Sequence, residues 1–306
     1  MNKKIAVLIL VMQHTAIMSF GKDLITAADS GRHDETVITV LNLRPTVLIK
    51  NNMMIRLNFD FRQYFRMLNT TSGRMEKLSE KDVLNEMLVN AYIDYGISGN
   101  VTIFAQLPLS DTHESTPAGV IAEKGLADIG AGVGYKLFDD RSGKNTITIE
   151  GTLYAPTGKS FRLTPSDYPS GMGIIRLKGA LTGLHRSENS AFIYSGYYEY
   201  RPANASDLNI GDEVGIIVLR QNYFKTIYGN FGVEYGGFSS VKAKDKMAGA
   251  DLVHTGDFAV DAFAGCWFEY QKNLFLRFGL PYTVYQNGSL FTKYNVLIQL
   301  DYRFKF

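Results

Sequence analysis

Histidines close to acidic residues are the first side chains in this chain that could carry chemistry. His113 lies between Asp111 and Glu114, and His254 has an aspartate three residues away on either side. Such groups could bind a metal ion or act as acid, base and nucleophile partners in the hydrolysis of lipids or peptides. A hydrolase of the phospholipase or protease type, with its site built on loops, is therefore one alternative for this chain. Solvated loop histidines are far commoner, so we expect no enzyme activity, no metal site and no cofactor.

Two further motifs are weaker. His185 is followed by Ser187 and Asn189, but their spacing is not the one we expect of a phospholipase. Lys159 comes directly after Pro-Thr-Gly, yet the Gly-x4-Gly-Lys-Ser/Thr spacing of a phosphate-binding loop is missing. Neither motif predicts a catalytic or nucleotide-binding site.

Composition excludes several classes of protein. The 306 residues carry 32 basic and 30 acidic side chains, a net charge of +2, so no overall field would attract nucleic acid, and we expect no such partner. Cys266 is the single cysteine, which excludes an internal disulfide framework. No apolar run of about 18 residues occurs, so any membrane span must be made of strands.

The first residues indicate export. Two lysines precede an eight-residue apolar run, and Ser19 and Gly21 suit a cleavage site, which predicts a secretory signal peptide over residues 1–21. We expect residues 22–52 to form a periplasmic N-terminal segment and residues 53–306 to form the main domain. Residues 34–40 resemble the short sequence motif by which energised receptors bind the TonB protein. Because those receptors need about 22 strands and a large plug, a periplasmic strand or tail is the preferred interpretation.

Alternation of apolar and polar residues then recurs along the whole chain. In residues 55–66 one face is Ile, Leu and Phe apart from Gln63, and the other carries Arg56, Asp60 and Arg62. This period of two is typical of strands with two different faces. We predict twelve such strands, near residues 55–66, 86–97, 101–109, 127–138, 146–155, 172–183, 191–201, 213–223, 230–238, 258–270, 274–284 and 294–306.

The connections between these segments favour a membrane barrel. Short links alternate with longer, polar ones, as the periplasmic turns and outer loops of outer-membrane barrels do. The predicted fold is therefore all-β: a transmembrane antiparallel up-and-down β-barrel of about 12 strands in the bacterial outer membrane. Its expected partners are the lipid bilayer and the outer-membrane insertion machinery. The second partner is expected because Phe306, preceded at alternate positions by Phe304 and Tyr302, resembles the C-terminal signal that this machinery reads. Aromatic residues near strand ends suit the two membrane interfaces.

Several motifs are similar to those of a known family. They are Tyr95-Gly96-Ile97-Ser98-Gly99-Asn100 with Leu107-Pro108-Leu109, Gly125-Leu126-Ala127-Asp128-Ile129-Gly130 with Gly134-Tyr135, Tyr154-Ala155-Pro156-Thr157-Gly158-Lys159, Gly279-Leu280-Pro281-Tyr282 and the terminal Asp301-Tyr302-Arg303-Phe304. In order and spacing the chain resembles the outer-membrane family named for the meta-pathway of phenol degradation, whose members are commonly labelled transporters. The resemblance implies a barrel that passes or binds hydrophobic or aromatic compounds, and it supplies no catalytic residues.

The barrel interior is the expected site, because an Arg or Lys facing lipid near the membrane midplane costs about 2–4 kcal/mol and the charged face must point inward. The residues predicted to line a pore are Arg56, Asp60, Arg62, Asp94, Asp128, Glu150, Arg176, Lys178, Glu199, Glu234, Asp261, Glu269, Arg277, Asp301 and Arg303. Inward acids and bases nearly balance, which is consistent either with a selective passage or with a cross-linked closed barrel. The function predicted is passive uptake of a small hydrophobic solute. The alternatives are a structural barrel without transport and the loop-based hydrolase.

Overall fold

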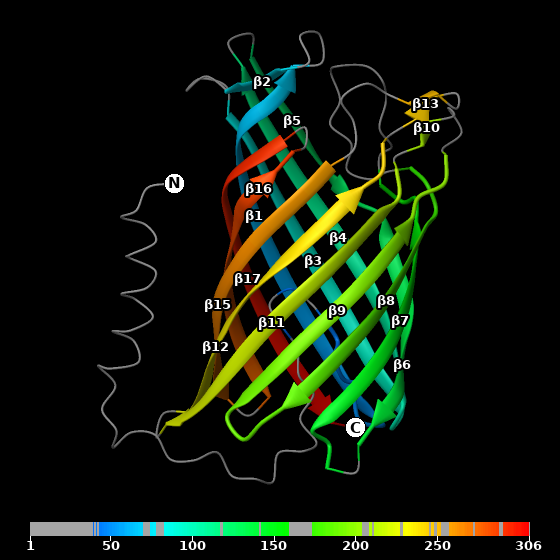
Figure 1. The fold of residues 1–306 in the computed structure, drawn as a ribbon, viewed down its shortest axis with the longest axis vertical. Helices are drawn as coiled ribbons and strands as arrows, with labels where there is room; N and C mark the ends of the chain where they lie inside the picture. The colour runs from blue at the N-terminus through cyan, green and yellow to red at the C-terminus, as the bar shows by residue number, and fades with distance from the viewer. Residues whose placement is uncertain are drawn as a thin grey trace.

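The computed structural model shows a closed antiparallel β-barrel (Figure 1). It describes residues 39, 41, 43–69, 74–77, 83–116, 119–140, 142–158, 173–203, 208–209, 211–226, 229–244, 246–247, 250–251, 257–271, 273–287 and 290–305. No described part of the chain forms a helix of the length and apolarity needed to cross a membrane.

Twelve long strands form the wall in the described part of the chain. They are β1 (Asn52–Asn69), β3 (Val83–Ser98), β4 (Val101–Thr116), β6 (Ile129–Asp139), β7 (Asn145–Ala155), β8 (Arg176–Arg186), β9 (Ser190–Tyr200), β11 (Glu213–Thr226), β12 (Gly229–Lys242), β15 (Asp257–Gln271), β16 (Leu274–Gln286) and β17 (Leu290–Lys305). Each pairs with its sequence neighbour, and β1 pairs with β17 from Asn52↔Lys305 onward to close the ring. The predicted twelve-stranded up-and-down barrel is therefore confirmed.

Short strands extend the wall at one end. β2 (Arg74–Lys77) pairs with the end of β1, and β5 (Gly119–Leu126) pairs with the second half of β4. β10 (Leu208–Asn209), β13 (Lys246–Met247) and β14 (Ala250–Asp251) form a separate small sheet. The opposite edge carries the short turns and the start of β1, and such an edge is periplasmic in barrels of this kind.

Several predicted boundaries differ from the observed ones, and two differences change the reading of the chain. The sixth predicted strand, near 172–183, corresponds to β8, which runs from Arg176 to Arg186, and the connection expected over residues 110–126 is largely a β4–β5 hairpin. Backbone pairing can continue beyond the span that meets lipid, where the strict alternation of side chains is no longer required. The alternating pattern therefore marks the membrane-facing part of a strand better than its hydrogen-bonded ends.

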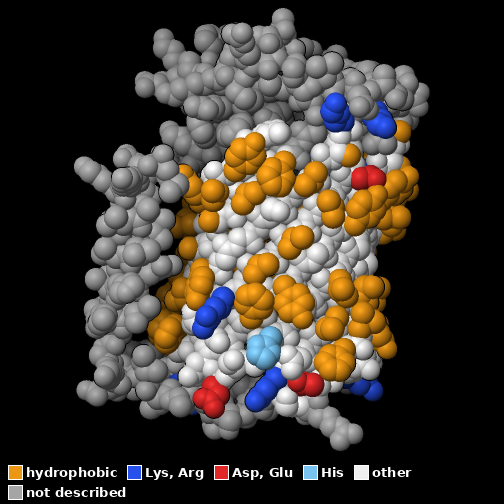
Figure 2. All heavy atoms as spheres, viewed as in Figure 1, with side chains coloured by type: hydrophobic (Ala, Val, Ile, Leu, Met, Phe, Trp, Pro, Cys, Tyr) orange, Lys and Arg blue, Asp and Glu red, His pale blue; other side chains and the backbone are white. Residues whose placement is uncertain are grey.

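The wall has an apolar outer face and an inner face that carries most of the charged side chains. On β9, Phe192, Tyr194 and Tyr198 are 43, 46 and 51% exposed, whereas the alternate residues Ser195 and Glu199 are buried. Figure 2 shows hydrophobic side chains spread over the visible wall between its two ends. This sidedness is the one that hydrocarbon outside and polar groups inside require.

Glycines on the inner face of β6 leave room for aromatic rings. A Cβ on Gly132 would collide with the Phe104 ring and the backbone oxygen of Gly151, and one on Gly130 would lie 3.0 Å from the Tyr154 ring. Glycines on an inner strand face can leave lumen space or permit bending of the sheet. At Gly130 and Gly132 the space is taken by side chains of the adjacent strands.

The sidedness of the wall predicts the effect of a charge placed on it. Leu181, in the middle of β8, is 52% exposed, and Ile97, one residue from the end of β3, is 46% exposed. We expect Leu181→Arg to lower the free energy of unfolding from phospholipid vesicles by about 2–4 kcal/mol, and Ile97→Arg to lower it by about 0–1 kcal/mol. Urea titration of both variants measures the difference, and equal losses would contradict the lipid-facing assignment of Leu181.

Candidate functional site

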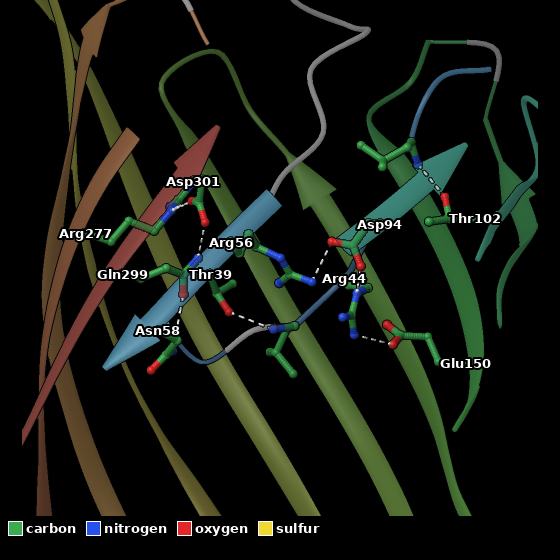
Figure 3. Close-up of polar contacts among 12 residues, drawn as sticks. Thr39, Arg44, Arg56, Asn58, Asp94, Thr102, Glu150, Arg277, Gln299 and Asp301 are labelled. Atoms are coloured by element: carbon green, nitrogen blue, oxygen red, sulfur yellow. Dashed lines mark hydrogen bonds and ion pairs between the residues drawn. The ribbon is translucent and has the colours of Figure 1, made fainter. Parts of the chain in front are cut away.

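A segment that precedes β1 lies inside the barrel. Its described residues are Thr39, Leu41 and residues 43–50, and we call it the inner segment. Figure 3 shows Thr39 and Arg44 among side chains of the inner wall, with the near wall cut away. The sequence predicted a periplasmic N-terminal segment over residues 22–52, outside the barrel of residues 53–306. That boundary stays a prediction for the residues that are not described, but the inner segment belongs to the barrel interior.

Arg44 attaches the inner segment to two strands at once. Its Nε donates to Asp94 Oδ1 on β3 at 3.1 Å, and its Nη1 donates to Glu150 Oε2 on β7 at 3.3 Å. The guanidinium also lies 3.9 Å from the centre of the Phe104 ring on β4. A planar guanidinium suits this combination of a ring face and two carboxylates. Arg44 was not among the predicted site residues.

Backbone contacts hold the inner segment on the same side of the barrel. Leu48 N donates to Thr102 Oγ1 at 2.7 Å, and Thr148 Oγ1 donates to the carbonyl oxygen of Arg44 at 3.0 Å. A Cβ on Gly96 would collide with the carbonyl oxygens of Leu48 and Ile49. Gly96, part of a motif noted in the sequence, therefore allows the inner segment to pass directly against β3.

The other end of the inner segment reaches the far wall. Leu41 and Leu43 pack against a buried apolar cluster that faces the interior, and Thr39 is fully buried. The members of this cluster, which we call the far-wall cluster, come from β8, β9, β11, β15 and β17: Leu184, Ala191, Ile193, Leu219, Phe263 and Leu297. Since Arg44 and Leu48 are bound to β3, β4 and β7, the inner segment crosses the barrel interior from one wall to the other.

Buried ion pairs continue from Arg44 into the wall. Arg56, fully buried, donates from Nη2 to Asp94 Oδ2 at 2.6 Å, so Asp94 accepts from two arginines. On the adjacent strands, Arg277 Nε donates to Asp301 Oδ2 at 2.6 Å, and Gln299 Nε2 donates to Asp301 Oδ1 at 2.7 Å. Figure 3 shows both groups side by side. Charges this deeply buried need partners because the cost of removing them from water is large.

A second group of charges lies near the loop end of the barrel. Glu199 Oε1 accepts from Arg176 Nη1 at 2.6 Å and from Arg201 Nε at 3.0 Å. Arg201 also donates to Glu213 at 2.6 Å, and Lys178 Nζ lies 4.2 Å from the centre of the Tyr197 ring. This outer cluster joins side chains of β8, β9 and β11 where these strands meet the loops. Glu213, at the start of β11, was not among the predicted residues, because alternation is hard to extend to a strand end.

The remaining predicted residues also lie at inward positions of their strands. Asp60 and Glu86 bind Arg62, Asp128 lies 3.6 Å from Arg176, Glu234 lies 3.9 Å from Arg277, and Glu269 accepts from Asn230. Asp261 is buried, and Arg303 lies over the Phe275 ring at 4.6 Å. The structure thus places the predicted set along the inner wall and joins most of its members in ion pairs or hydrogen bonds. Whether they line a route for a solute stays a prediction.

The histidine motifs do not come together in the described part of the chain. His113 Nε2 lies 2.8 Å from Asp111 Oδ1, and Lys124 binds the other oxygen of that carboxylate. His185, at the end of β8, contacts Asn145 through Nδ1 at 2.7 Å. His254 and Lys159 lie outside the described residues.

Comparison with known proteins identifies the fold. No protein-family model matches the sequence, and no curated protein matches it. Among solved structures, an outer membrane channel from Pseudomonas putida F1 is similar over 90% of this chain and 100% of its own, at 11% identity and a TM-score of 0.70. The β domain of the Bordetella autotransporter BrkA is similar over 83% of this chain and 100% of its own, at 14% identity and a TM-score of 0.50. The chain has the fold of an outer-membrane barrel. Its membership of the meta-pathway family stays a prediction.

Asp94 is the carboxylate on which two buried arginines depend. We expect Asp94→Asn to lower the free energy of unfolding by about 3–5 kcal/mol, because it leaves charge on Arg44 and Arg56 without a full counter-charge. Asp139→Asn, which removes the partner of Lys136 at the periplasmic edge, serves as the control and should cost about 0–1 kcal/mol. Urea unfolding in detergent micelles measures both, and equal effects would argue against the buried network.

Proposed function

We propose that this protein is an outer-membrane channel that takes up small hydrophobic or aromatic molecules by passive diffusion. One observation carries this proposal: the interior holds aromatic rings beside its charges. Tyr92, Phe104, Trp267 and Phe275 are buried at inward positions. An interior built only to conduct water and ions has no need of such rings, whereas an apolar solute can lie against them. The similar fold of the Pseudomonas channel is consistent with this proposal.

In this proposal the charged groups orient a solute and the inner segment controls the width of its route. Outer loops admit the solute, and Arg62, Arg176, Glu150 and Asp261 select by charge and hydrogen bonding. No energy source acts. The inner segment has to shift for a solute to pass, and Arg44 is its strongest attachment because it joins Asp94 and Glu150. The fifteen residues predicted to line the pore keep that role within this proposal.

A closed structural barrel is the second candidate. It is favoured by the inner segment itself, which crosses the interior and is fixed at both walls. The two candidates differ in what happens when the attachment at Arg44 is weakened. A channel then opens further, whereas a barrel whose interior is filled by other side chains stays closed.

Conductance in planar bilayers tests this difference. We expect a small conductance for the wild type and one several times larger for Arg44→Ala, because the variant loses both ion pairs that hold the inner segment. Lys136→Ala, which removes an exposed pair with Asp139, is the control for loss of a positive charge and should resemble the wild type. Absence of current from every variant would favour the closed barrel.

Uptake by cells tests the solute class. Gram-negative cells that express the protein should take up N-phenyl-1-naphthylamine faster than cells without it, as a faster rise of fluorescence. Uptake of a sugar of similar size should not change. A protein that speeds sugar uptake and leaves the aromatic probe unaffected would contradict the hydrophobic part of the proposal.

The hydrolase alternative has a direct test. We expect the purified protein to hydrolyse neither phospholipid nor a peptide substrate, and His113→Ala and His254→Ala to leave this unchanged, since His113 is engaged by Asp111. Release of fatty acid and cleavage of the peptide are the measurements. Turnover by the wild type that disappears in either variant would overturn the channel proposal in favour of an enzyme.

A further inference from the structure

An arginine stands on the lipid-facing side of the wall. Arg220 belongs to β11 and is exposed, while its neighbours in sequence, Leu219 and Gln221, are 0 and 1% exposed inside the barrel. The other outward residues of the same strand include Val214, Ile216 and Val218. Among the described residues of β6 to β17, leaving out the strand ends, Arg220 is the only charged residue at an outward position.

The depth of Arg220 follows from the strand register. It pairs with Phe192, the third residue of β9, and β9 begins at the periplasmic edge with Ser190. On the other side it pairs with Tyr235 of β12. Arg220 is therefore close to the periplasmic edge on the β9 side, and both residues paired with it carry rings that suit a membrane interface. Figure 2 shows basic and histidine side chains toward this end of the visible face, among and below the hydrophobic ones.

Nothing in the described part of the protein neutralises Arg220. Its guanidinium has no ion pair and no hydrogen bond to a described residue, although the interior arginines of the networks described above are all paired. Glu188, in the β8–β9 turn, forms no ion pair with it. A lone cation on a lipid-facing surface is unfavourable unless its side chain reaches the interface or finds an anion there.

We propose that Arg220 binds the phosphate of a phospholipid in the periplasmic leaflet. The guanidinium extends toward the β8–β9 turn and donates two hydrogen bonds to phosphate oxygens, the geometry that arginine prefers for this group. Phe192 and Tyr235 lie beside the acyl chains of the same lipid. This inference rests on the membrane placement within the proposed function and does not depend on transport.

Native mass spectrometry of the full-length protein released from detergent tests the proposal. With phosphatidylglycerol present, we expect the wild type to retain one lipid more than Arg220→Gln, and Arg220→Lys to retain an intermediate amount because it keeps the charge but loses the paired donors. Diacylglycerol with the same acyl chains lacks the phosphate and should bind wild type and Arg220→Gln equally. Val218→Ala, which changes an adjacent outward residue, is the matched control and should keep the wild-type lipid count.

The outcome is decided even if a variant folds poorly. A wild-type protein that retains phosphatidylglycerol and diacylglycerol to the same extent would overturn the proposal without any variant. Equal phosphatidylglycerol counts for wild type and Arg220→Gln, with both barrels folded as judged by their mobility on unheated gels, would overturn it as well. Failure of the channel proposal would appear instead in the conductance of Arg44→Ala, which this lipid site does not affect.

Discussion

The exclusion of charge from hydrocarbon is the constraint on which the rest of this structure depends. Within the membrane, the backbone groups of the strands must pair with one another, and side-chain charges must face the enclosed side of the wall. The interior that results is crowded with ionised groups. Because burial makes an unpaired charge costly, these groups form connected pairs such as Arg56–Asp94 and Arg277–Asp301.

The inner segment contributes a cation to the charged groups of the wall. Asp94 and Glu150 face the interior from β3 and β7, and Arg56 of β1 pairs with Asp94. Arg44 lies between them and contacts each. The barrel wall and the inner segment therefore stabilise each other electrostatically. The wall provides the carboxylates that bind the segment, and the segment provides a cation that offsets the cost of burying those carboxylates.

The fold could be read from the sequence because one physical rule, alternation between lipid and interior, repeats in every strand. Positions such as Arg56, Glu199 and Asp301 followed from it, and the structure places them inside the wall. The inner segment could not be found in this way. It has no alternation, and its partners lie far along the chain: Arg44 is 50 residues from Asp94 and 106 from Glu150. Gly96 carried a signal as part of a motif, but its reason, close passage of another backbone, is visible only in three dimensions.

The two attachments of the inner segment differ in kind, and this difference bears on what could move it. On the near wall Arg44 is held by ion pairs and Leu48 by a hydrogen bond, while on the far wall Leu41 and Leu43 make apolar contact with the far-wall cluster. Burial of a leucine side chain contributes about 1.5–3 kcal/mol, and an apolar solute can replace that contact whereas a strongly hydrated one cannot. In the proposed channel, a hydrophobic solute would therefore compete with Leu41 and Leu43 for the far-wall cluster and leave Arg44 in place. In that case hydrophobic solutes would displace the far-wall end of the inner segment, and polar solutes would leave it in place.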